Sequence, residues 1–137
     1  MYEQPINMNS RFYNAYLAAS EIYLSKRKDY HPASSLIEAA LRQRPGEVRV
    51  RSALYANLGR VDIGVANWDQ AQGNLRQPMQ IAPTRGSPHC LLAEVLEAQS
   101  KADWALSEWG LCAAMSNQIE VAPWRIAADR RLSGFHP

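Results

Sequence analysis

The chain has 137 residues, of which 47% are hydrophobic and 20% charged, and its net charge is +2. A chain of this length is expected to form one domain, residues 1–137, that buries roughly two thirds of its unfolded surface. The charge is too evenly balanced to predict binding of nucleic acid. No stretch approaches the ~18 apolar residues of a membrane span, and no secretory signal opens the chain. We therefore expect a cytoplasmic protein that does not insert into membranes.

Helical periodicity predicts an all-α chain of about seven helices. Pro32 and Pro88 stand where the first turn of a helix tolerates proline. Pro78 lies inside the fourth expected helix, so we expect a kink or an early end near Gln77. The expected helices span residues 11–27, 32–44, 47–64, 68–81, 88–100, 102–115 and 123–132.

Small, large and turn residues recur at matching places in three stretches of about 34 residues, 14–47, 52–85 and 86–119. Four extra residues, 48–51, precede the second stretch and are expected to add one helical turn. The matching residues are Lys28, Ala33, Ile37 and Ala40 in the first stretch, Gly59, Ala66, Ala71 and Leu75 in the second, and Ala93, Ser100, Ala105 and Trp109 in the third.

This spacing resembles the tetratricopeptide repeat, whose pattern runs W-x2-L-G-x2-Y, then A-x3-F, then P. Lys28 and Ala66 stand where that family carries a turn glycine, while Leu24 and Asp62 stand where it carries tyrosine. The resemblance implies a right-handed superhelix of antiparallel helix pairs, a tetratricopeptide-like α-solenoid, closed by a capping helix at residues 123–133. An ordinary helical bundle with coincidental periodicity stays open as the alternative.

In the tetratricopeptide family the first helix of each repeat lines a concave groove that binds other proteins. The resemblance therefore implies a groove floored mainly by alanines, with room for an apolar peptide or helix and with charged groups that fix its register. Close packing of helices is the alternative role of the same alanines. The implied groove residues are Ala15, Ala18, Ile22, Lys26, Ala53, Ala56, Asn57, Arg60, Ile63, Cys90, Glu94 and Glu97.

Four tryptophans and two cysteines add further expectations. Trp68 and Trp104 lie near turns between helices and are expected to form an exposed aromatic edge, because tryptophan is enriched at binding hot spots. Trp109 and Trp124 are both expected in the core, with Trp124 sealing the capping helix against the last repeat. Cys90 and Cys112 fall on neighbouring expected helices, where free buried thiols are favoured over a disulfide in a reducing compartment.

Catalytic and cofactor signatures are nearly absent from the sequence. The histidines are far apart, and no histidine or cysteine pair has the spacing of a zinc site. Glu94 and Glu97 lie three residues apart and are better explained as a solvated acidic face than as paired catalytic carboxylates. We therefore expect no enzymatic activity and no cofactor.

Two functions stay open. The first is an adaptor or chaperone whose groove holds a segment of a partner protein; its size and three-repeat layout are similar to those of the small tetratricopeptide chaperones of bacterial secretion systems. The second is a scaffold subunit of a larger assembly, docked through its convex face or its edges. Self-association is compatible with either function, and both require a protein or peptide partner.

Overall fold

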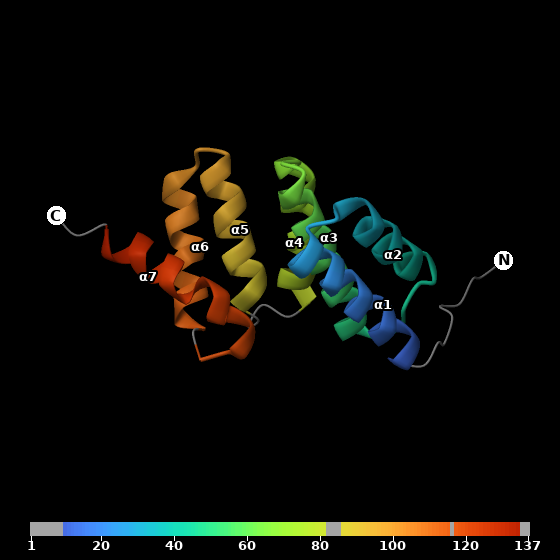
Figure 1. Ribbon diagram of the computed structural model, residues 1–137. Coiled ribbons are helices and arrows are strands. Elements are labelled where there is room, and N and C mark those ends of the chain that lie inside the picture. Colours follow the sequence, from blue (N-terminus) through green and yellow to red (C-terminus); the bar gives the residue numbers. More distant parts are fainter. Residues whose placement is uncertain (1–9, 82–85, 116, 135–137) are drawn as a thin grey trace. The chain divides into compact units, whose positions relative to one another are not determined.

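The computed structural model describes residues 10–81, 86–115 and 117–134, and over these ranges the chain consists of helices and turns without a strand. A π-helix, η1 (Tyr23–Arg27), extends the first α-helix, and a 3-10 helix, η2 (Ile119–Trp124), precedes the last. The prediction of an all-α chain with about seven helices is confirmed. The α-helices are α1 (Ser10–Ile22), α2 (Tyr30–Arg42), α3 (Val48–Gly64), α4 (Trp68–Ile81), α5 (Gly86–Ala98), α6 (Ala102–Ala114) and α7 (Arg125–Ser133) (Figure 1).

The chain forms two compact units, Met1–Ile81 and Ala82–Pro137, which are called the N-terminal and C-terminal units and are described separately. In the N-terminal unit α1 packs on α2 and α3, and α3 packs on both α2 and α4. In the C-terminal unit α5 packs on α6, α6 packs on α7, and η2 lies against α5. Within the described ranges, none of the helices is both long and apolar enough to cross a bilayer.

The turns inside the three helix pairs share one backbone conformation. Lys28, Ala66 and Ser100 are left-handed, with φ of 50°, 60° and 61°, and each stands at the turn of its predicted repeat. Residues other than glycine and asparagine rarely adopt this conformation, because the Cβ atom of an L-residue then approaches the following carbonyl oxygen. Arg44, in the turn between α2 and α3, is left-handed as well, with φ of 53°, so the conformation recurs at matching places in the pairs and also ends α2.

The same hydrogen bonds close the second and third turns. The N–H of Asn67 donates to the carbonyl of Asp62, and the N–H of Lys101 donates to that of Leu96, both over 2.8 Å. Such a bond between residues five apart satisfies a carbonyl that the end of the helix leaves unpaired.

Each turn is followed by the same pattern of buried residues. An alanine begins the second helix of each pair in the core, and a large side chain four residues later fills the space beside it. Small residues at such places let two helix backbones approach each other. The buried pairs are Ala33 with Ile37, Ala71 with Leu75, and Ala105 with Trp109.

The π-helix η1 changes the register expected for the first repeat. The N–H of Asp29 donates to the carbonyl of Tyr23, one residue further back than in the other two turns, because a π-helix accommodates an extra residue. Tyr23, and not Leu24, therefore stands at the position where the repeat pattern carries a tyrosine. By the same shift Ser20, which is fully buried, takes the place assigned to the exposed Glu21.

Two further expectations about the helices have opposite outcomes. Residues 48–51 form the first turn of α3, so the extra helical turn predicted there is confirmed. Helix α4 continues through Pro78 to Ile81, which confirms the expected range, so of the kink or early end expected near Gln77 the early end is wrong. Proline leaves the carbonyl of Asn74 without its helical donor, but its ring is fully buried, and burial of apolar area offsets that loss.

A disulfide joins Cys90 on α5 to Cys112 on α6, with the two Cα atoms 5.0 Å apart. The expectation of free thiols is therefore wrong. Both cysteines are fully buried between the paired helices, at a separation that suits the geometry of a disulfide. The bond ties together the two helices on which the rest of the C-terminal unit packs.

Replacement of Ala66 by glycine is expected to raise the free energy of unfolding by about 1 kcal/mol, because glycine adopts the left-handed conformation without a Cβ contact. Urea unfolding of the two proteins measures the difference. Ala15→Gly, in the right-handed helix α1, is the control and should lower the same free energy by about 1 kcal/mol. A loss of stability in both variants would contradict a left-handed Ala66.

Removal of the disulfide by the double substitution Cys90→Ala and Cys112→Ala is expected to lower the stability of the C-terminal unit by about 3 kcal/mol, since the bond closes a loop between residues 22 apart. Thermal unfolding with and without reductant measures the effect. Reductant should lower the transition of the parent protein and leave that of the double variant unchanged. An equal response to reductant in both proteins would show that the bond does not form.

Candidate functional site

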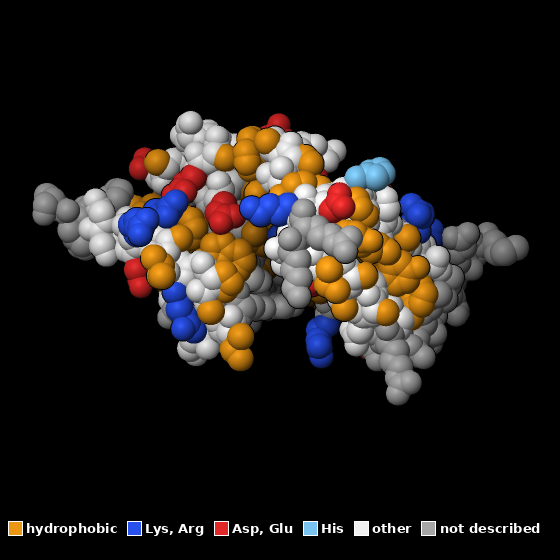
Figure 2. All heavy atoms as spheres, viewed as in Figure 1, with side chains coloured by type: hydrophobic (Ala, Val, Ile, Leu, Met, Phe, Trp, Pro, Cys, Tyr) orange, Lys and Arg blue, Asp and Glu red, His pale blue; other side chains and the backbone are white. Residues whose placement is uncertain are grey.

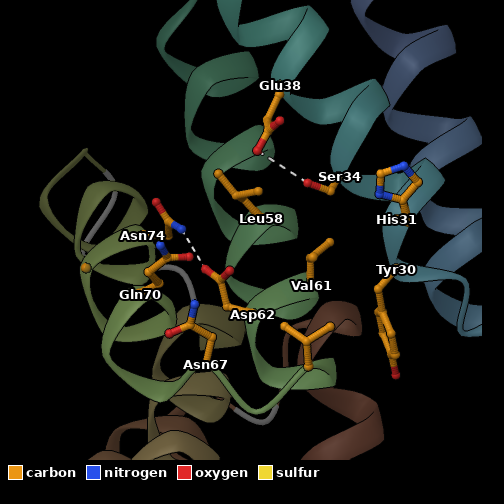
Figure 3. Close-up of a pocket in the computed structure, with 12 residues that line it drawn as sticks. Tyr30, His31, Ser34, Glu38, Leu58, Val61, Asp62, Asn67, Gln70 and Asn74 are labelled. Carbon is orange, nitrogen blue, oxygen red and sulfur yellow. Dashed lines mark hydrogen bonds between the residues drawn. The ribbon is translucent and has the colours of Figure 1, made fainter.

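A cavity of about 680 Å³ opens in the N-terminal unit between α2 and α4, with α3 as its floor (Figure 3). We call it the α2–α4 cleft. Ligand sites in proteins commonly have volumes of roughly 300–1,000 Å³, so the cleft is large enough to bind one. Its lining consists of Tyr30, His31, Ser34 and Glu38 from α2, Leu58, Val61, Asp62 and Val65 from α3 and its C-terminal end, and Asn67, Gln70, Gly73 and Asn74 from α4 and the residue before it.

Helical spacing brings these side chains together. His31, Ser34 and Glu38 follow one another at three- and four-residue intervals, so they share one face of α2. On α4, Gln70 and Asn74 are related in the same way. Because α2 and α4 both pack on α3, their polar faces form two walls above an apolar floor.

Asp62 is the most buried ionisable side chain of the cleft, with only 5% of its surface exposed. The Nδ2 atom of Asn74 donates a hydrogen bond of 2.6 Å to its Oδ2 atom. Burial raises the pKa of Asp62, the hydrogen bond from Asn74 lowers it in part, and the negative charge of Glu38 raises it further. Among the described residues nothing donates to its Oδ1 atom, and Figure 3 shows the carboxylate between the two walls.

Glu38 gives the cleft a second carboxylate. Its side chain is exposed, and its Oε1 atom accepts a bond of 3.3 Å from the hydroxyl of Ser34. The lining contains neither lysine nor arginine, and within the described part of the chain neither Glu38 nor Asp62 forms an ion pair. The lining therefore carries two carboxylates, and His31 is the lining side chain that can take up a positive charge.

The groove residues expected in the N-terminal unit lie elsewhere on α1 and α3, and none of them lines the cleft. On α3, Ala53, Ala56 and Ile63 are half-buried, while the side chain of Lys26 lies outside the described residues. On α1 three residues are exposed: Ala15, Ala18 and Ile22.

The polar members of that expected groove hold α3 to the first helix. Arg60 places its Nη1 atom 2.8 Å from both carboxylate oxygens of Glu21, and its Nη2 atom donates to the hydroxyl of Ser25 over 3.2 Å. Asn57 is buried and donates to the hydroxyl of Ser20 over 3.2 Å. Charge pairing by Arg60 thus acts within the unit.

In the C-terminal unit the expected groove residues are engaged in internal contacts. Cys90 is buried in the disulfide. Glu94 accepts a bond of 3.0 Å from the indole of Trp124, and Glu97 accepts bonds of 2.8 Å from Trp109 and 2.9 Å from Arg131. The hydrogen bond from Arg131 lowers the pKa of Glu97. The two glutamates are therefore not a simply solvated face, because they hold α6, η2 and α7 to α5.

The tryptophans divide between the surface and the core. Trp104 is 63% exposed, and the ammonium of Lys101 lies 5.5 Å from the centre of its ring. Trp68 is half-buried, so only one of the two expected edge residues is largely exposed. Trp109 is fully buried, which confirms its predicted place in the core.

Surface charges of both signs are interspersed on the face drawn in Figure 2, and hydrophobic side chains of the N-terminal unit gather there over α1.

Over the described residues, no three side chains of the metal-binding types lie close enough together to hold a metal ion. No protein-family model matches the chain, and no curated protein is significantly similar to it in sequence.

Sequence reasoning did not identify the cleft, although two residues signal it. Asp62 stands where the repeat pattern carries a tyrosine, and an aspartate leaves empty the volume that an aromatic ring fills. Gly73 lies inside α4, where glycine is unfavourable, and a Cβ atom added there would meet nothing within 4 Å. Both are departures toward smaller side chains on neighbouring helices, and together they mark an open space.

Substitution of Asp62 by asparagine is expected to raise the free energy of unfolding at neutral pH. The pKa of Asp62 is raised in the folded chain, so its ionisation destabilises the fold. This loss of stability is absent below the pKa that Asp62 has in the unfolded chain. It grows as the pH rises to the pKa of Asp62 in the folded chain, and it is constant above that pKa. Urea unfolding at a series of pH values should show the advantage of the variant vanishing in acid. An advantage that is the same at every pH would contradict the raised pKa.

Proposed function

We propose that this chain is a protein-binding module, an adaptor or chaperone that holds a segment of a partner protein. The observation that carries the proposal is a repeated helix-pair pattern, in which a left-handed turn is followed by a buried alanine and, four residues later, by a large buried side chain. This repetition favours tetratricopeptide-like repeats in an α-solenoid over a bundle with coincidental periodicity, because a bundle does not require matching turns. Repeats of this kind serve mainly to present binding surfaces.

The exposed face of α1 supports a place for the partner in the N-terminal unit. Ile22 is half-exposed although it is a large aliphatic residue, and Ala18 and Ala15 lie exposed one and two turns before it on the same helix. Ala56 on α3, which packs on α1, is half-buried. An apolar strip with such short side chains leaves room for an incoming helix or extended segment.

A scaffold subunit of a larger assembly is the second candidate, and the exposure of Trp104 favours it. Large aromatic side chains that are both exposed and held at a turn are suited to docking against another protein. In this version the C-terminal unit supplies the contact, and no exchangeable segment is bound. A second copy of the chain is also a possible partner for this surface.

The expected cytoplasmic location remains a prediction, and the Cys90–Cys112 disulfide argues against it. Thiols of cytosolic proteins are kept reduced, whereas disulfides persist in oxidising compartments. We therefore infer that the protein works in an oxidising compartment. No arrangement in the described residues suggests a reaction, so a binding role is proposed without enzymatic activity.

Ala56→Arg is expected to abolish recovery of the partner from native cells, because a long charged side chain would project into the apolar strip. Tagged protein is purified from those cells and the retained proteins are identified by mass spectrometry. Gln80→Arg, at an exposed position of α4, makes a similar change of charge outside the strip and should leave recovery intact. Equal recovery with both variants would remove the α1–α3 surface as the binding site.

The scaffold alternative is separated by Trp104→Ala in the same purification. Because Trp104 is largely exposed, this change should leave the helical circular dichroism unchanged. Loss of a stable complex from this variant alone would favour the scaffold, whereas loss from Ala56→Arg alone would favour the adaptor or chaperone.

A further inference from the structure

We propose that the α2–α4 cleft receives a basic side chain, lysine or arginine, from the bound partner segment, with Asp62 as its buried counter-ion. This inference rests on the proposed protein-binding function and specifies the chemistry of the partner. It assigns a role to a site that lies away from the apolar strip on α1 and α3.

The first support is an uncompensated charge in a confined space. Asp62 is 5% exposed, and within the described chain its Oδ1 atom has no donor and its carboxylate has no cationic partner. An ionised carboxylate that is mostly buried and is stabilised within the described chain only by the neutral amide of Asn74 is costly, and such groups are concentrated at functional sites. A cation entering the cleft would supply the missing partner.

The second support is the composition of the walls. Glu38 adds a carboxylate on the opposite wall, and the side chains of Asn67, Gln70 and Asn74 line the cleft with amide oxygens. Carboxylates and amide oxygens accept hydrogen bonds from ammonium and guanidinium groups. An anionic occupant would be repelled by Asp62 and Glu38, and a wholly apolar occupant would leave both carboxylates unpaired, so the lining favours a cation with several donors.

The third support is the shape of the cleft. Its floor is apolar, formed by Leu58, Val61 and Val65, and the carboxylate of Asp62 lies among them. A lysine or arginine carries three or four methylene groups between its charge and its backbone, and these would cover the floor while the charge reaches Asp62. A bare metal ion would leave the floor uncovered.

Binding of short capped pentapeptides to the full chain tests the proposal. Four peptides differ only in a central lysine, arginine, citrulline or glutamine flanked by alanines, where citrulline is the uncharged counterpart of arginine. Titration of the ¹⁵N-labelled protein to about 10 mM peptide allows weak, single-contact binding to be measured by NMR. The lysine or the arginine peptide should shift amide signals of α2, α3 and α4 around the cleft, and the neutral peptides should not.

Variants of the cleft separate charge from shape. Asp62→Asn should weaken binding of the basic peptide by about tenfold or more, as expected when a hydrogen-bonded charge is removed. Glu38→Gln should weaken it less, because that side chain is exposed. Gly73→Leu keeps every charge but fills the open space beside Gln70 and Asn74, and should also reduce binding. Asp69→Asn, at an exposed place on α4 outside the lining, is the matched control and should bind as the parent does.

The cation-binding proposal is overturned if the neutral peptides bind as tightly as the basic ones, if no peptide shifts the cleft signals, or if Asp62→Asn and Asp69→Asn bind equally well. These outcomes leave the protein-binding function untouched, because the Ala56→Arg purification tests that separately. Conversely, basic peptides that bind the cleft while Ala56→Arg retains its partner would uphold the cleft and reject the α1–α3 strip.

Discussion

Close approach of paired helices is the constraint on which the rest of this structure depends. A Cβ atom at Gly59 would lie 2.8 Å from the side chain of Leu75, so α3 and α4 can pack at their observed spacing only because glycine lies between them. Ala33, Ala71 and Ala105 have the same role after the turns. With the backbones fixed this closely, the large residues one turn later fill the core, and the walls of the cleft are held apart at a defined distance.

Much of the fold could be predicted because the buried positions of a helix carry apolar residues at three- and four-residue spacing. The bounds of α4 agree with the expected range, and those of α3 differ by one residue, since turns and caps use a small set of residue types. The π-helix η1 could not be predicted, because a π-helix and an α-helix are formed by the same types of residue. The pattern predicted the range of α4 but also favoured a break at Pro78, because the burial that lets the helix continue there depends on tertiary packing.

The candidate site was less predictable than the fold, for a physical reason. Residue patterns report side chains that fill space, whereas the α2–α4 cleft results from side chains that leave it empty, at Asp62 and Gly73. The groove expected from the resemblance shows the complementary difficulty. Position along a helix does not reveal that Glu97 is bound by Trp109 and Arg131, because these partners come from later helices. Local spacing therefore indicated which helices exist, and tertiary contacts determined which polar groups remain available.

The burial of the Cys90–Cys112 bond has a kinetic consequence. Neither sulfur-bearing residue has surface exposed to solvent, so a thiolate in solution can attack the bond only after α5 and α6 separate. Under strong reductant the rate of bond cleavage would then be limited by the frequency of that opening. The time course of disulfide reduction would therefore measure how often α5 and α6 separate in the C-terminal unit.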